Sequence, residues 1–199
     1  MFEVLTTQDF DRWLRRLKDR QGRLRILARL DRLSAGNLGD AKPVGGGVLE
    51  LRLTFGPGYR IFLTRRGQQV VLLLCGGDKS TQTDDIARRG NWPALGTRRR
   101  GTMTETYTRF DAVSYLENIE DVAGYLQIAL EESHEDPTAV PRALGVIARS
   151  GNMSELARRV GMSRDGLYKA LSDQGNPTWT TVLKVSEALG LRLSFEAVA

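Results

Sequence analysis

The chain has 199 residues, of which 41% are hydrophobic and 27% charged, a composition typical of soluble globular proteins and a length that suits one large domain or two small ones. No apolar run approaches the length of a membrane span, so we expect no membrane partner. The single cysteine, Cys75, excludes an internal disulfide and is consistent with a cytoplasmic location. With only one histidine, His134, the sequence offers almost nothing for a His/Cys metal site, so we expect no metal and no cofactor.

Charge divides the chain into two regions. Residues 1–96 hold 17 Lys/Arg against 10 Asp/Glu, whereas residues 103–199 hold 9 Lys/Arg against 14 Asp/Glu. Between them, residues 97–102 (TRRRGT) show no periodicity and are interpreted as a linker. The pattern predicts a basic unit and an acidic unit that attract each other. Met103 at this boundary favours a fusion of two reading frames.

The first unit, residues 1–96, is predicted to be α+β. Hydrophobic periodicity and capping residues indicate the following elements: a strand at 2–6, a helix starting near Thr7 or Asp9, a second helix after Gly22, strands at 48–55, 59–65 and 69–75, and a short helix from about Ser80 or Thr81. The last strand is a continuous apolar run, which is typical of a central strand covered on both sides.

The hairpin ELRLTFGPGYRIFL, residues 50–63, carries two arginines on otherwise apolar strands. A turn centred on Pro57 would turn Tyr59 and the leucines to the core and leave Arg52 and Arg60 as diagonal neighbours on the opposite face. Like charges so close favour a bound anion such as phosphate, which Lys79 could also reach. Alternatively, Glu50 pairs with Arg52 and the face is merely solvated. Alternation alone leaves both interpretations open.

The second unit, residues 103–199, is predicted to be helical, with an acidic helical stretch at about 112–132. Residues 153–172, MSELARRVGMSRDGLYKALS, have the form helix, turn, helix, with Gly161 in the turn and Ser163 capping the second helix. This motif lies in a segment of about 139–199, which includes a further helix from about Thr178. The candidate DNA-binding residues are Arg158, Ser163, Arg164, Asp165, Tyr168 and Lys169. The net negative charge of this unit counts against DNA binding.

Two stretches of the sequence resemble known families. GNLGDAKPVGGGVLELRLTFGPGYRIFL, followed by VVLLLCGGDKSTQTDDIARR, resembles the RelE/HigB-like addiction-module killer toxins of the RelE/ParE superfamily, over about residues 1–95. YLQIALEE, ALGVIARSGNMSELARRVGMSRDGLYKALS and GNPTWTTVLKVSEALGL resemble the HigA-like addiction-module antidotes, which carry a Cro/repressor-type helix-turn-helix.

The first resemblance implies a RelE-like fold, two helices on a small antiparallel sheet, and the second implies an all-α helix-turn-helix domain that follows it. The first also implies an mRNA endonuclease that acts in the ribosomal A site, with ribosome and mRNA as partners of the free toxin. Arg52, Arg60 and Lys79 become candidates for phosphate binding and transition-state stabilisation, with Tyr59 as a weaker candidate because its register turns it to the core. Relatives with a catalytic histidine have no counterpart here.

The second resemblance implies an antitoxin that neutralises the toxin, within one chain or between two, and that binds operator DNA as an autorepressor and homodimer. The fused chain is then expected to be non-toxic, with its nuclease latent. Two alternatives stay open: a DNA-binding regulator without nuclease activity, and a ParE-like toxin that acts on a topoisomerase.

Overall fold

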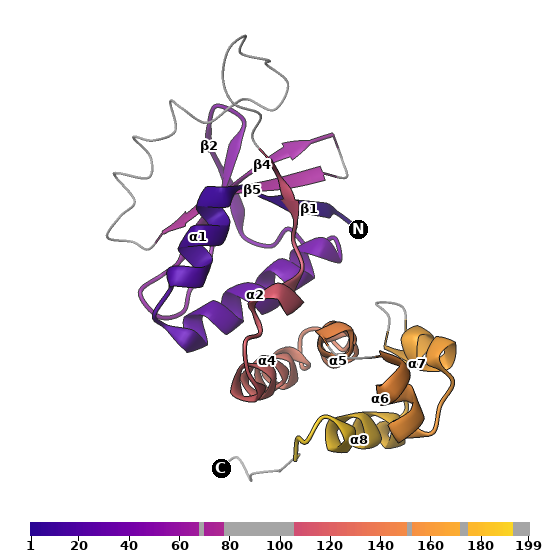
Figure 1. Ribbon diagram of the computed structural model, residues 1–199. Coiled ribbons are helices and arrows are strands. Elements are labelled where there is room, and N and C mark those ends of the chain that lie inside the picture. Colours follow the sequence, from indigo (N-terminus) through magenta and orange to yellow (C-terminus); the bar gives the residue numbers. More distant parts are fainter. Residues whose placement is uncertain (68–69, 78–105, 151–152, 172–174, 193–199) are drawn as a thin grey trace. The chain divides into compact units, whose positions relative to one another are not determined.

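The computed structural model describes residues 1–67, 70–77, 106–150, 153–171 and 175–192 (Figure 1). The chain divides into two compact units, Met1–Phe110 and Asp111–Ala199. The expected linker at 97–102, the expected helix near Ser80 and the candidate residue Lys79 lie outside the described residues.

The first unit begins with strand β1 (Glu3–Thr6), followed by helices α1 (Gln8–Arg16) and α2 (Arg20–Ser34). Thr7 caps α1 by accepting a hydrogen bond from the Phe10 amide at 3.2 Å. Asp19 caps α2 in the same way, with the Gly22 amide at 2.9 Å. The second helix therefore starts before Gly22, where the sequence placed it after that residue, because the aspartate supplies the cap.

One sheet organises the first unit. Its other strands are β2 (Ala41–Gly45), β3 (Val48–Arg52), β4 (Arg60–Arg66), β5 (Val70–Gly77) and β6 (Thr108–Arg109). Their order is β2-β3-β4-β5-β1-β6. The sheet is mixed, whereas an antiparallel sheet was expected, because β1 runs parallel to β5 while the other neighbouring strands pair antiparallel.

The hairpin between β3 and β4 differs from the predicted register. Arg52 lies directly opposite Arg60, so the turn is centred on Gly56 and not on Pro57. The Leu53 amide donates to the Tyr59 carbonyl at 2.9 Å inside this turn. Gly56 and Gly58 have φ angles of 55° and 79°, a region that a side chain disfavours, and these two glycines allow the wider turn.

Each face of this sheet carries apolar side chains. On one face α1 packs against β5 (Figure 1). The Trp13 ring lies so close to Gly76 that a Cβ atom there would clash with it. The opposite face carries Arg52 and Arg60, and we call it the arginine face. Alternation along β3 and β4 places Val48, Glu50 and Phe62 on it as well. Val48 and Phe62 form a buried cluster with Leu72 and Leu74.

The second unit is helical in its described residues. It comprises η2 (Ala112–Tyr115), α4 (Ile119–Glu132), α5 (Ala139–Ser150), α6 (Met153–Val160), α7 (Arg164–Ala170) and α8 (Trp179–Ala188). The predicted stretch at 112–132 is interrupted because Asn118 caps α4, accepting from the Asp121 amide at 2.9 Å. Asp121 reciprocates by accepting from the Glu117 amide at 3.0 Å and is fully buried. It therefore adds no exposed charge to the acidic stretch predicted at about 112–132.

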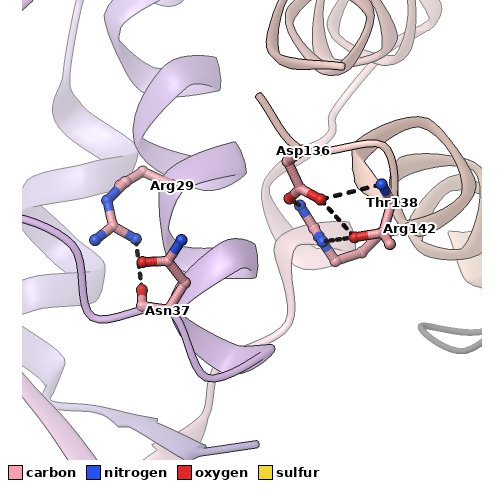
Figure 2. Close-up of polar contacts among 5 residues, drawn as sticks. All are labelled: Arg29, Asn37, Asp136, Thr138 and Arg142. Atoms are coloured by element: carbon pink, nitrogen blue, oxygen red, sulfur yellow. Dashed lines mark hydrogen bonds and ion pairs between the residues drawn. The ribbon is translucent and has the colours of Figure 1, made fainter. Parts of the chain in front are cut away.

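Two arginines hold local chain segments in place (Figure 2). In the first unit, Arg29 of α2 donates to the backbone carbonyls of Asn37 at 3.0 Å and Leu38 at 2.5 Å. In the second unit, Arg142 of α5 is buried and pairs with Asp136 at 2.7 Å, while it also donates to the Thr138 hydroxyl. Both interactions satisfy groups at helix ends and in loops, so these guanidiniums serve the fold.

Candidate functional site

Arg52 and Arg60 share one buried carboxylate. Nε of Arg52 donates to Oε2 of Glu50 at 2.9 Å, and Nη1 of Arg60 donates to Oε1 of the same residue. The Glu50 side chain is 1% exposed, whereas Arg60 is 16% and Arg52 39% exposed. The structure thus brings the two predicted arginines together on the arginine face, with both pointing at the carboxylate that sequence reasoning had paired with Arg52 alone.

The charge state of this cluster follows from its contacts. Burial by itself would raise the pKa of Glu50, but the hydrogen bonds and positive charges of Arg60 and Arg52 outweigh it and hold the pKa below its ordinary value. Glu50 is therefore ionised at neutral pH and the three side chains together carry one net positive charge. Among the described residues, Nε of Arg60 is buried without a hydrogen-bond partner. Because the cluster has a net positive charge and Arg52 is 39% exposed, it can still attract an anion.

Tyr59 does not join the two arginines. Its side chain is buried, and its hydroxyl donates to Oδ2 of Asp19 at 2.8 Å, at the start of α2. Its ring lies edge-on to Trp13 of α1, with centroids 6.5 Å apart. The next residue along the chain, Arg60, points to the other face of the sheet. Tyr59 therefore packs with the helices, as its sequence register indicated.

The position of Lys79 relative to this cluster is not described. Gly77, the last residue of β5, pairs with Arg60, and Lys79 itself lies beyond the described residues. In the part of the chain that the structure describes, no group of three or more His, Cys, Asp or Glu side chains could hold a metal ion.

The second candidate site is the pair of helices α6 and α7. Gly161 follows α6 with a φ of 76°, and the Met162 amide donates to the Ala157 carbonyl at 2.9 Å. This arrangement is a Schellman stop, which requires a residue that tolerates a left-handed backbone. Ser163 then caps α7 by accepting from the Gly166 amide at 3.0 Å. Helix, turn and helix are formed as the sequence predicted, with Leu156, Leu167 and Leu171 buried.

The outer face of α7 carries the predicted DNA-binding side chains. Arg164 and Asp165 are exposed and lie 3.9 Å apart, and Tyr168 is 58% exposed. Lys169 is exposed on the same helix, whereas Arg158 on α6 is held by Glu155 through two hydrogen bonds at 2.7 and 3.0 Å. Sequence reasoning missed Trp179, which is 53% exposed at the start of α8. An aromatic ring directly after the Thr178 cap was the available signal.

Comparison with known families defines the class of this protein. The chain is a component of a toxin–antitoxin addiction module. Residues 12–90 match the family described as phage-derived Gp49-like proteins. Residues 106–197 match the family described as probable addiction module antidote proteins. The chain belongs to these families, with a Gp49-like region followed by an antidote region.

Two relatives from Haemophilus influenzae, both described as uncharacterized proteins, are similar to parts of this chain. One is 49% identical over 84 residues, which cover 42% of this chain and 85% of the relative. The other is 46% identical over 94 residues, which cover 47% of this chain and 95% of the relative. No solved structure matches the chain. None of the helices in the described ranges is long and apolar enough to cross a membrane.

Proposed function

We propose that the chain is a fused toxin and antitoxin, in which residues 1–96 are a RelE/HigB-like, ribosome-dependent mRNA endonuclease and residues 103–199 neutralise it and repress their own operon. The arginine cluster is the observation that supports the nuclease. Two guanidiniums meet on one sheet face, one of them 39% exposed, and they outnumber the carboxylate between them. The family match over residues 106–197 supports the antidote, and the arrangement of α6, turn and α7 supports its role as a repressor.

In RNA cleavage of this type, the ribose 2′-oxygen gives up its proton and bonds to the adjacent phosphorus, while the bond from phosphorus to the next 5′-oxygen breaks and that oxygen takes up a proton; solvent can supply and accept both protons. Negative charge grows on the phosphoryl oxygens as the new bond forms, so fixed cations lower the barrier. Arg52 and Arg60 would bind these oxygens, since a guanidinium can donate two parallel hydrogen bonds to a phosphate. The lowered pKa of Glu50 makes it a weak base, so its role is to hold the two guanidiniums in place.

The nuclease is tested by expressing residues 1–96 in bacteria and mapping the 5′ ends of a reporter mRNA by primer extension. We expect growth arrest with cuts inside translated codons, reversed when residues 103–199 are co-expressed, and no arrest by the full chain. Arg52→Ala and Arg60→Ala should each abolish the cuts. Arg66→Ala removes an exposed arginine from the end of β4 and is the matched control, which should still cut.

The other outcomes separate the alternatives. Arrest without mRNA cuts, accompanied by altered plasmid supercoiling, would replace the nuclease with a toxin that acts on a topoisomerase. Absence of any arrest, with residues 1–96 present as folded protein, would leave a DNA-binding regulator without a toxin.

The exposed face of α7 supports DNA binding by the second unit. Ser163 and the first residues of α7 stand at the end that a recognition helix presents to base edges, and Lys169 could reach a phosphate. We expect the full chain to shift DNA from upstream of its own coding sequence in a gel assay, as a dimer. Arg164→Ala and Lys169→Ala should each weaken binding roughly tenfold, since a specific contact is worth about 1–3 kcal/mol. Lys184→Ala, on α8, is the charge-matched control.

A further inference from the structure

The antidote-family region contributes a strand to the sheet of the first unit. The match to that family begins at residue 106, yet the compact first unit extends to Phe110. Within this segment, β6 pairs antiparallel with β1, with Thr108 opposite Thr6 and Arg109 opposite Leu5. The Phe110 amide continues the ladder by donating to the Val4 carbonyl at 2.9 Å. Residues 106–110 therefore match the antidote family in sequence, but in the structure they belong to the first unit.

Side chains reinforce this pairing on both sides of the strand. Thr6, which is almost fully buried, donates from its hydroxyl to the Thr108 carbonyl at 3.2 Å. Phe110 is 9% exposed. Tyr107 packs against the buried cluster of Val48, Phe62, Leu72 and Leu74. A segment of five residues thus contributes backbone hydrogen bonds and two aromatic rings to the sheet.

The place of β6 in the sheet explains why a strand is needed there. In the order β2-β3-β4-β5-β1-β6, β6 is the one strand among the described residues that covers the outer side of β1. Without it, the amides and carbonyls of β1 on that side would form an open edge, which readily accepts a strand from another segment or chain. Strand addition of this kind draws affinity from the main chain and specificity from alternate side chains.

We propose that residues 106–110 are the anchoring strand by which the antidote region binds the Gp49-like region, at the outer edge of β1. This inference deepens the proposed neutralisation and rests on it for its effect in cells, but the binding itself does not depend on nuclease activity. The opposite charges of the two regions make the acidic helical stretch at about 112–132 another candidate for a neutralising contact. The anchoring strand is a separate contact that precedes that stretch in the chain.

The anchor also bears on the arginine face. Tyr107 packs against the buried cluster, and two members of that cluster, Val48 and Phe62, share a sheet face with Arg52 and Arg60. Removal of the strand would therefore expose part of a cluster that lies on the same sheet face as the arginines.

The test uses the full chain with a specific protease site placed within residues 97–102. After cleavage, we expect the two fragments to co-elute in size-exclusion chromatography at micromolar concentration. Phe110→Pro removes the amide that donates to Val4 and should weaken the association by at least about tenfold. Arg109→Pro is the matched control, because alternation along an antiparallel pair turns the Arg109 amide away from β1, where proline is tolerated. That variant should co-elute.

Two further measurements keep the result independent of any one variant. Thr6→Val keeps the shape of the side chain, removes its hydrogen bond to Thr108 and should speed dissociation of the cleaved fragments severalfold. In the uncut chain, the Phe110 amide should exchange with solvent more slowly than the Arg109 amide. Separation of the wild-type fragments after cleavage would overturn the proposal, as would equal retention in Phe110→Pro and Arg109→Pro. Loss of nuclease activity in every form of the chain would overturn the proposed function and leave the anchor standing.

Discussion

Glu50 can be changed to glutamine with little change in shape, which isolates the effect of its charge. The substitution would leave Arg52 and Arg60 directly opposite each other with no counter-charge between them. Removing one partner of a fully buried ion pair costs about 3–5 kcal/mol, and the partial exposure of Arg52 should reduce this to about 2 kcal/mol. Urea denaturation of Glu50→Gln against the wild type measures the loss. An unchanged unfolding free energy would mean that the pairing contributes nothing to the fold.

The same residue predicts a pH dependence. The pKa of Glu50 lies below its ordinary value of 4.5 in the folded chain, so its ion pairs stabilise the protein fully above about pH 4.5. This contribution is lost as the pH falls through the folded-state pKa, because protonation then removes the negative charge. We expect the stability difference between wild type and Glu50→Gln to be constant from pH 5 to 7 and to shrink below pH 4.5. A difference that stays constant down to pH 3 would contradict the pairing.

Tyr59 distinguishes a structural role from a catalytic one. Tyr59→Phe removes the hydroxyl that bonds to Asp19 and leaves the ring against Trp13 in place. We expect the unfolding free energy to fall by about 1 kcal/mol, the typical worth of one such hydrogen bond. The mRNA cuts made by residues 1–96 should persist, because the hydroxyl lies on the helix side of the sheet. Loss of the cuts in a stable, folded variant would return Tyr59 to the catalytic group.

At the scale of elements, close packing of α5 against the end of α7 gives a further prediction. A Cβ atom on Gly145 would stand 2.2 Å from the backbone carbonyl oxygen of Leu171. Alanine is the better helix former by about 1 kcal/mol, but this clash cannot be relieved by a side-chain rotation, so the helices must separate. We expect Gly145→Ala to destabilise the second unit and to weaken DNA binding, as measured by thermal unfolding and gel shift. A stabilised variant would show that α5 and the end of α7 can move apart at little cost in free energy.

Some elements could be predicted from the sequence and others could not, for physical reasons. Apolar spacing and capping residues such as Ser163 predict the helices of both units. A continuous apolar run predicts β5. Strand β2 was missed because Pro43 and the glycines after it resemble a loop, although an edge strand tolerates proline. Strand β6 has two residues, and its partner β1 lies about a hundred positions earlier in the chain. No local sequence pattern could therefore predict β6.

The candidate sites show the same limit. Alternation placed Arg52 and Arg60 on one face, but their direct opposition depends on which residue centres the turn, and Gly56 and Pro57 are both plausible from composition alone. That Glu50 serves both arginines follows from this register. On α7, helical spacing and a single cap were enough to predict which residues are exposed, and the structure places them as predicted.

At the scale of the whole molecule, the fusion itself should keep the toxin silent through high local concentration of the antidote. Inserting about 20 Gly/Ser residues within 97–102 lowers the effective concentration only modestly, because it falls with roughly the −3/2 power of linker length. We therefore expect the lengthened chain to remain harmless to growing cells. Phe110→Pro in the same lengthened chain should slow growth, because the anchoring strand is then released more often, while Arg109→Pro should not. Growth arrest by the lengthened wild-type chain would mean that tight spacing, and not the strand, restrains the toxin.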